Sequence, residues 1–351
     1  IAVSYGAPAA DGTGLKIAII SFGGGFLQSD LNSSISDLKN ANLISNSITA
    51  PIIQQQLFGG ATGAFAVDNP SFENTLDIYC IATLVPGATI KIYIAPNDIS
   101  WWPTIINQII ADGYHILSCS WGYPESYNNS YPTLIQNIEN SFALLDSTNI
   151  ALCAASGDKG SSNTVDTFPA VALPASSTHT LGIGGTKLVL NPDNSRQLEI
   201  DDNRDPNVGG IPGLWGGGGG ISSLYAAPAW QNNLSYTRIT GGTGLVTFTG
   251  GTIQPPQALA MRGVPDVSAP MNPYAMYFNS TLYGVAGTSA AAPVMAGFLA
   301  RLQQLTGVQR GSTAWNTFFY ANKDKFFDIS VGTNNVELPD GYVGTVGWDA
   351  V

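Results

Sequence analysis

The sequence predicts an α/β fold built on a doubly wound, mainly parallel β-sheet with helices on both faces. Short apolar runs rich in β-branched residues, typical of strands buried on both faces, alternate with helical patterns over the first two-thirds of the chain. The 351 residues contain no internal repeat and no convincing linker, so we expect a single domain over 1–351. Hydrophobic residues are 44% and charged residues 11% of the chain, which favours a compact protein over a disordered one.

The individual elements follow from this alternation. The predicted buried strands are 15–21, 89–95, 114–120, 149–156 and 178–185. The predicted helices are 71–85, 103–112, 133–147 and about 289–305. Strands that alternate with helices in this way form right-handed βαβ crossovers and a parallel sheet. Residues 190–265 are rich in Gly, Pro and Asn, and we expect long surface loops there, with a hairpin near 244–253.

The charge balance excludes two classes of partner. The net charge is −11, whereas nucleic acids and anionic membranes are bound by basic surfaces. No apolar run is long and unbroken enough to span a bilayer. With 24 acidic and 13 basic residues, the chain has few ion pairs to lose on protonation, which fits work in acid.

Cysteines and glycosylation motifs bear on the compartment. Three cysteines lie in apolar runs without metal-ligand spacing, namely Cys80, Cys119 and Cys153. An odd number leaves at least one thiol free, and we expect buried free cysteines. Four Asn-X-Ser/Thr motifs occur, at Asn32, Asn128, Asn233 and Asn279. They fit a secreted chain, and the start at Ile1 rather than Met predicts a processed product that is extracellular or in an acidic lysosome or vacuole.

The stretch GTSAAAP (287–293) places Ser289 just before an apolar helix, as expected for a hydrolase nucleophile. Such a serine needs a base to take its proton. The chain has only two histidines, His115 and His179, and neither lies in a catalytic context. We expect both histidines to be structural.

Two carboxylates are candidates for the missing base. Glu73 and Asp77 stand at i and i+4 on one face of a helix that is otherwise largely apolar. Two buried like charges should titrate as a coupled pair with one raised pKa, so that one of them serves as general base in the acidic range. Alternatively, they are solvent-facing acids in the first helical turns, stabilised by the helix dipole.

Asp158 follows a buried strand, at the edge of the sheet where parallel-sheet proteins bind ligands. A protonated aspartic acid there could donate a hydrogen bond to a developing oxyanion. The alternative is an ordinary Ser-Gly-Asp turn.

Together these residues resemble the sedolisin (serine-carboxyl) peptidases. The motifs that carry the resemblance are GTSAAAP with Ser289, ENTLD with Glu73 and Asp77, SGDKG with Asp158 and SWG with Trp121. Further matches lie at 17–26, 86–97, 217–231, 262–269 and 326–335. The resemblance covers nearly the whole chain. It implies a subtilisin-like fold without the subtilisin histidine, and a zymogen whose N-terminal prodomain is absent from this mature catalytic domain.

The resemblance also implies roles. Ser289 is the nucleophile, Glu73 the general base, Asp77 the acid that orients and relays protons to Glu73, and Asp158 the partner of the Ser289 N–H in the oxyanion hole. Trp121 packs over the carboxylate pair and excludes water. Some members carry a further acidic residue where this chain has Ser21, which predicts a shorter proton relay.

A calcium site is implied near the end of the chain. The carboxylates of Asp328 and Asp349 and the carbonyls of Ile329, Thr345 and Gly347 would hold one structural Ca²⁺, for which oxygen ligands are suited. Without the resemblance, this stretch would be interpreted as an acidic turn with no metal.

Gly217, Gly218 and Gly219 belong to a glycine run that lacks the Gly-Lys-Ser/Thr ending of a phosphate loop. We expect it to let a peptide substrate approach the backbone. Asp166 lines a substrate pocket or is a plain surface acid, and Asp266 is structural.

These observations predict an acid-acting serine-carboxyl peptidase, either endopeptidase or tripeptidyl peptidase, that is monomeric. Two alternatives stay open. One is a catalytically silent homologue that binds peptides. The other is a neutral esterase that pairs Ser289 with a histidine, although the chain has no Gly-x-Ser-x-Gly motif at Ser289.

Overall fold

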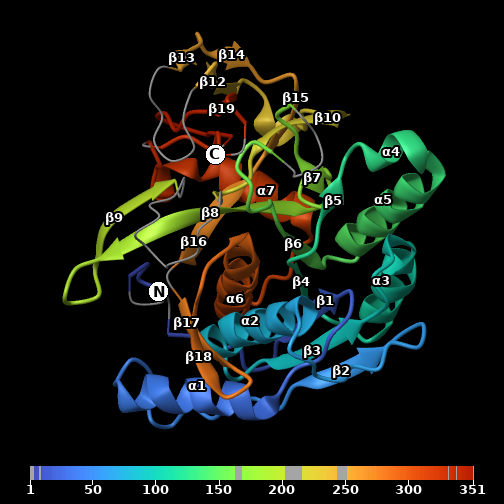
Figure 1. Cartoon of the computed structure of the whole chain (residues 1–351), viewed down its shortest axis with the longest axis vertical. Helices are drawn as coiled ribbons and strands as arrows, with labels where there is room; N and C mark the ends of the chain where they lie inside the picture. The colour runs from blue at the N-terminus through green and yellow to red at the C-terminus, as the bar shows by residue number, and fades with distance from the viewer. Residues whose placement is uncertain are drawn as a thin grey trace.

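A parallel β-sheet forms the centre of the computed structural model (Figure 1). The structure describes residues 4–7, 9–162, 168–201, 216–242, 251–272, 274–330, 332–336 and 338–350. The strand order is β16–β8–β6–β4–β1–β3–β2, with every neighbouring pair parallel, and β9 adds antiparallel to β8. The bounds are β1 Lys16–Ser21, β2 Gln54–Leu57, β3 Thr89–Ile94, β4 Ile116–Cys119, β6 Ala151–Ala155, β8 Leu181–Leu190, β9 Arg196–Asp201 and β16 Val267–Asn272.

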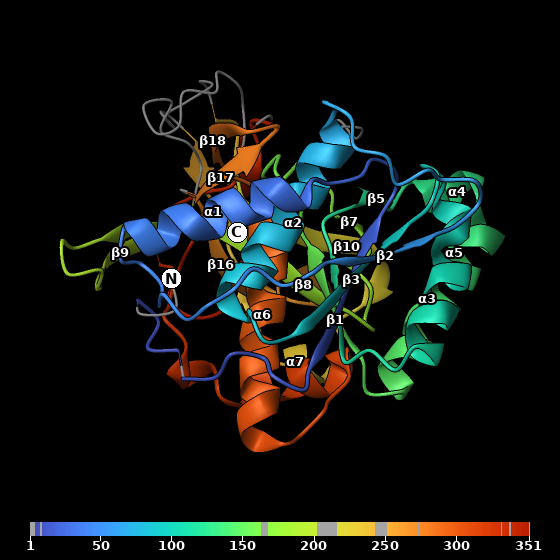
Figure 2. The ribbon, with the colours of Figure 1, turned by 90° about the horizontal axis from the view of Figure 1, so that it is seen from below.

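Helices cover both faces of this sheet (Figure 2). In β1, Ile17 and Ile19 belong to one core and Ala18 and Ile20 to the other, because successive side chains of a strand point to opposite faces. Helices packed in the first core are α1 Gln28–Asn40, α2 Asn69–Leu84, α6 Thr288–Thr306 and α7 Ser312–Ala321. Those in the second are α3 Trp102–Ala111 and α5 Pro132–Ser147. The predicted doubly wound α/β fold is therefore confirmed.

Further strands and short helices lie outside the central sheet. They are β5 Tyr123–Pro124, β7 Ala172–Leu173, β10 Gly220–Ala226, β11 Ser235–Tyr236, β12 Arg238–Thr240, β13 Thr252–Ile253, β14 Gln257–Ala258, β15 Met261–Val264, β17 Tyr274–Phe278, β18 Thr281–Val285, β19 Gly341–Tyr342, α4 Tyr127–Ser130, η1 Ile99–Trp101, η2 Ala229–Gln231 and η3 Lys323–Lys325. Among the described residues, none of the helices is both long and apolar enough to cross a membrane.

The five predicted strands correspond to β1, β3, β4, β6 and β8, and the four predicted helices to α2, α3, α5 and α6. The expectation of long loops over 190–265 is wrong for its described parts. Strand β9 extends the sheet there, and β10 pairs with β15. Both β9 and β10 contain many polar or small residues, so they lack the buried β-branched pattern by which the other strands were predicted. The turn of the predicted hairpin near 244–253 lies outside the described residues.

All three cysteines are free and buried, as expected. Cys80 lies on α2, Cys119 on β4 and Cys153 on β6, and each side chain is at most 1% exposed. Burial is the main cause that raises the pKa of each thiol well above its usual value.

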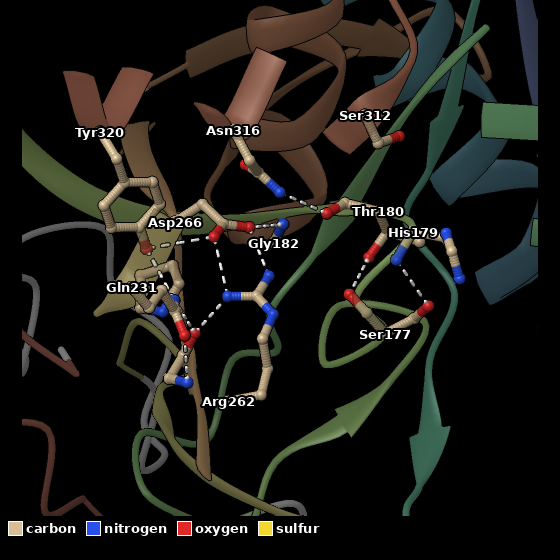
Figure 3. A network of polar contacts seen from close by, with 12 residues as sticks. Ser177, His179, Thr180, Gly182, Gln231, Arg262, Asp266, Ser312, Asn316 and Tyr320 are labelled. Carbon is tan, nitrogen blue, oxygen red and sulfur yellow. Dashed lines mark hydrogen bonds and ion pairs between the residues drawn. The ribbon is translucent and has the colours of Figure 1, made fainter. Parts of the chain in front are cut away.

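A buried ion pair at the end of β15 contacts β8 and α7 (Figure 3). The Arg262 guanidinium donates 2.8 Å and 2.5 Å hydrogen bonds to the two carboxylate oxygens of Asp266, and both side chains are fully buried. Asp266 also accepts hydrogen bonds from the Gly182 N–H at 2.8 Å and from the Tyr320 hydroxyl at 3.1 Å. An unpaired charge in the interior is costly, so this network fixes β15 against β8 and α7. Asp266 thus makes structural contacts, as predicted.

Candidate active site

Helix α2 carries the two acids towards the start of α6. Its first turn is capped by Asp68, whose carboxylate accepts a 2.9 Å hydrogen bond from the Ser71 N–H, with proline in that turn. The cap fixes where the helix begins, and therefore which face carries Glu73 and Asp77. That face meets α6, against which α2 packs in the first core (Figure 2).

The acid pair is largely removed from water. Asp77 is fully buried, and although Glu73 is partly exposed, its Oε1 is buried. Among the described residues, neither Glu73 Oε1 nor Asp77 Oδ2 has a hydrogen-bond partner. Burial raises the pKa of Glu73 to about 7, helped by the charge of Asp158 and opposed by the hydroxyls of Ser289 and Ser120. Burial and the charge of Glu73 raise the pKa of Asp77 well above its usual value.

Ser289 lies in the first turn of α6, and its hydroxyl is close enough to Glu73 to lower the pKa of that carboxyl. The residue before this turn, Gly287, has a φ of 145°, and a Cβ at this position would lie 2.9 Å from Asp158 Oδ2. Only glycine therefore allows the chain to enter α6 so close to the Asp158 carboxyl. The structure brings the serine and both acids of α2 to one place.

Asp158 follows β6 and is held at the N-terminus of α6. Its Oδ1 accepts a 2.6 Å hydrogen bond from the Thr288 N–H and a 2.7 Å hydrogen bond from the Thr288 hydroxyl. The Gly157 N–H in turn donates to the Thr288 hydroxyl at 3.1 Å. The carboxyl of Asp158 is thus placed beside the residue that precedes Ser289, where backbone N–H groups favour negative charge.

Ser120 also belongs to this site, although its sequence context did not mark it as a candidate. Its hydroxyl donates a 2.6 Å hydrogen bond to Asp77 Oδ1 and lies 3.2 Å from the Ser289 carbonyl oxygen. That carbonyl would normally accept from the backbone N–H four residues later, but this residue is Pro293, which has none. The features of the sequence that could have indicated Ser120 are its place at the end of a predicted strand and the proline four residues after Ser289.

Trp121 lies next to Ser120 and packs edge-on against Phe22, with ring centroids 6.0 Å apart. Its indole Nε1 is buried and has no hydrogen-bond partner among the described residues. That Trp121 covers the acid pair stays a prediction. Ser21, at the end of β1, donates its hydroxyl to the Gly23 carbonyl at 3.1 Å rather than to the acids.

The histidines have other partners. The Nδ1 of His115 accepts a 2.9 Å hydrogen bond from the Lys16 N–H, and burial lowers its pKa. The Nδ1 of His179 lies 3.4 Å from Asp146, whose hydrogen bond raises the pKa of this imidazole. Both histidines are thus engaged by groups unconnected with the nucleophile.

The glycine run is buried within the protein. A Cβ on Gly218 would lie 2.4 Å from the Ser156 carbonyl oxygen, and one on Gly219 would lie 2.4 Å from that of Ala350. Close packing of this chain against itself therefore explains both glycines. Contact of Gly217, Gly218 and Gly219 with a substrate stays a prediction. Asp166 lies outside the described residues.

Two of the expected calcium ligands come together near the end of the chain. Asp349 accepts 2.9 Å and 2.7 Å hydrogen bonds from the N–H and hydroxyl of Thr345, and Asp328 accepts from the Gly347 N–H. Burial first, and then the charge of Asp328, raises the pKa of Asp349 to about 6. Within the described ranges no group of three or more His, Cys, Asp or Glu side chains could hold a metal. Two mutually repelling carboxylates in a loop with backbone carbonyls nevertheless fit an oxygen-liganded cation.

Comparisons with known proteins agree with this arrangement. The Subtilase family model matches residues 60–317. Kumamolisin from Bacillus sp. (strain MN-32) is 30% identical over 97% of this chain and 57% of its own length. Tripeptidyl-peptidase sed5 of Aspergillus fumigatus is 26% identical over 76% of this chain and 46% of its own length. The chain thus spans about half the length of these relatives.

The likeness extends to three dimensions. The solved structure of Pseudomonas sedolisin, a serine-carboxyl proteinase complexed with two molecules of pseudo-iodotyrostatin, superposes with a TM-score of 0.74 at 22% identity. The match covers 100% of this chain and 93% of that one, which confirms the predicted subtilisin-like fold. The chain therefore belongs to the subtilase family and, within it, to the sedolisin-like group of serine-type peptidases.

Proposed function

We propose that this chain is an acid-acting serine-carboxyl peptidase, which hydrolyses peptide bonds through an acyl-enzyme on Ser289. The observation that carries the proposal is the position of Glu73. Burial raises the pKa of this carboxyl and the hydroxyl of Ser289 lowers it, so the two side chains are neighbours, and a serine peptidase otherwise places histidine beside its nucleophile. The relatives named kumamolisin, sedolisin and tripeptidyl-peptidase support the same activity.

In the proposed reaction, ionised Glu73 takes the Ser289 hydroxyl proton while Oγ attacks the peptide carbonyl carbon. The Ser289 N–H holds the resulting oxyanion together with the carboxyl of Asp158, which donates a hydrogen bond when it carries a proton. Glu73 then gives its proton to the leaving amine as the C–N bond breaks, which leaves the acyl-enzyme. Water attacks the acyl carbon and loses a proton to Glu73, and that proton returns to Ser289 Oγ as the acid product leaves.

The test is a pH–rate profile of the full chain on a peptide library. We expect cleavage whose kcat/KM rises with pH through the weakly acidic range, because Glu73 must lose its proton and its pKa is about 7. The same library separates endopeptidase from tripeptidyl peptidase by the lengths of its products. Peptide binding without cleavage at any pH would favour the silent homologue, and a rate that depends on His115 or His179 would favour the neutral esterase.

We also propose one structural Ca²⁺ held by Asp328, Asp349 and the carbonyls of Ile329, Thr345 and Gly347. Excess Ca²⁺ should raise the melting temperature, because a ligand at about 100 times its Kd stabilises the folded state by about 2.7 kcal/mol. It should also lower the pKa of Asp349. The response should disappear in Asp349→Asn and persist in Asp324→Asn, which alters an exposed acid paired with Lys325. Melting that is unchanged by Ca²⁺ and by a chelator would exclude the ion.

Three further proposals rest on the family resemblance alone. We expect synthesis with an N-terminal prodomain, a secreted or acidic-compartment location, and a monomeric state. Sizing chromatography of the mature chain, with and without an added prodomain peptide, addresses the first and third.

A further inference from the structure

We propose that the free edge of β18 (Thr281–Val285) binds the leaving half of a peptide substrate, and that Tyr283 favours a large apolar side chain in that half. The leaving half is the part of the substrate that departs as the amine when the acyl-enzyme forms. The inference rests on the proposed function and adds a substrate class to it, namely peptides with an apolar residue on the amine side of the cleaved bond.

The hairpin of β17 and β18 lies next to both the base and the nucleophile. β18 ends only four residues before Ser289, so its last Cα is at most about 15 Å from that of the nucleophile. On its inner face, Phe278 and Tyr283 pack edge-on against Phe72, with ring centroids 5.1 Å and 5.8 Å from that of Phe72. Phe72 directly precedes Glu73 on α2. A few extended substrate residues therefore reach from the reacting serine along β18.

The side on which the hairpin lies assigns it to the leaving half. In the proposed reaction Glu73 gives its proton to the leaving amine, so this nitrogen lies at Glu73 when the C–N bond breaks. Asp158, on the oxyanion side, follows β6 and is held by the Thr288 N–H. The hairpin instead packs against α1 and α2, the helix of Glu73 (Figure 1). The peptide that continues from the leaving nitrogen is thus directed towards β18.

The backbone of β18 has one unpaired edge. Its strand pairs with β17 in a two-stranded antiparallel sheet, and no other element among the residues that the structure describes is hydrogen-bonded to it. Four of its five residues are exposed. The space over Gly284 is open, because a Cβ there would meet no atom within 4 Å. An unpaired edge is a template for an extended chain, whose backbone supplies the matching N–H and C=O groups.

The side chains of this edge are large and apolar. Tyr283 is 41% exposed although it packs against Phe72, so part of its ring is open to solvent. Leu282 points to the opposite face of the strand and is 56% exposed. Successive side chains of a peptide paired with β18 would lie beside these two residues. Covering apolar surface that is otherwise in water favours apolar substrate residues at both positions.

The experiment measures the preference of wild type and Tyr283→Ser in the leaving half. The substrates are peptides with one acyl half, whose leaving half carries phenylalanine or serine at each position in turn. In wild type, kcat/KM should be about 10-fold or more higher for phenylalanine than for serine at one position, the usual effect of filling an apolar pocket. Tyr283→Ser should lose this ratio. A ratio between two substrates does not depend on how much of the variant is active, so a loss of folded enzyme alone would not change it.

Three further variants sharpen the comparison. Tyr283→Phe keeps the ring and should keep the preference. Leu305→Ser is the matched control, because it removes a leucine that is 54% exposed at the far end of α6, and it should leave the preference unchanged. If Tyr283→Ser does not fold, Leu282→Ser tests the same edge from its outer face and should lose the preference at the neighbouring substrate position.

The outcomes separate this inference from the proposed function. A wild-type chain that cleaves neither these peptides nor the same acyl half joined to aminomethylcoumarin overturns the function. A wild type that cleaves them without regard to the leaving half, or serine variants that keep the wild-type preference, overturns the inference alone. N-methylation of the leaving-half amides tests the pairing without any variant. Only alternate N–H groups of a paired strand face its partner, so cleavage should fall at alternate positions, and an equal response at every position would refute the pairing.

Discussion

Glu73→Gln is expected to lower kcat/KM for peptides by about 10²–10⁴-fold, the usual contribution of a positioned general base. The amide fills the same space but cannot accept the Ser289 proton. Initial rates over the weakly acidic range, together with urea unfolding of each variant, measure the effect. Glu139→Gln is the matched control, because Glu139 is another glutamate whose pKa is raised by burial, and it is hydrogen-bonded to Ser177 on the other side of the sheet.

At neutral pH, Glu73→Gln should have a higher free energy of unfolding than the wild type. The pKa of Glu73 is about 7 in the folded chain against an ordinary 4.5, so folding favours its protonated form. That contribution is complete below pH 4.5 and is lost as the pH rises through about 7. Glutamine cannot ionise and avoids the loss. Full activity together with unchanged stability would contradict the assignment of Glu73 as a buried base.

Asp158→Ala should lower kcat by about 10²–10³-fold with little change in KM, because a donor to the oxyanion acts in the transition state rather than in substrate binding. Asp158→Asn should retain more activity than Asp158→Ala, since an amide also donates a hydrogen bond. Single-turnover acylation rates measure the effect on the chemical step.

Asp193→Asn serves as the control for Asp158, because Asp193 caps an exposed turn through Ser195. The hydrogen bonds from Thr288 to Asp158 also support the start of α6, so stability is measured for each variant. If Asp158→Asn is as inactive as Asp158→Ala, the Asp158 carboxyl does not act as a hydrogen-bond donor to the oxyanion.

The sequence predicted the sheet well because its central strands are continuous apolar runs. It predicted the acid pair because residues four apart share a helix face, a local property that spacing reveals. Helix α1 was not predicted, because only four of its residues are buried and two of those are polar. Strand β9 depends on pairing with β8 rather than on its own pattern.

Ser120 could not be recognised as a site residue from its own neighbourhood. Its importance comes from contacts with residues 43 and 169 positions away, which exist only once β4, α2 and α6 are packed. Pro293 was visible as part of the motif around Ser289. That it opens a carbonyl for a hydroxyl from another strand follows only from the folded arrangement.

The three buried thiols have a practical consequence. The three thiols lie on three different elements, and each is protonated and shielded from solvent while the protein is folded. A thiol reagent added to the native enzyme therefore marks only molecules that have opened, and the position of the mark identifies which layer opened first. The three cysteines can therefore report the order in which parts of the protein unfold, without a change to any residue of the proposed chemistry.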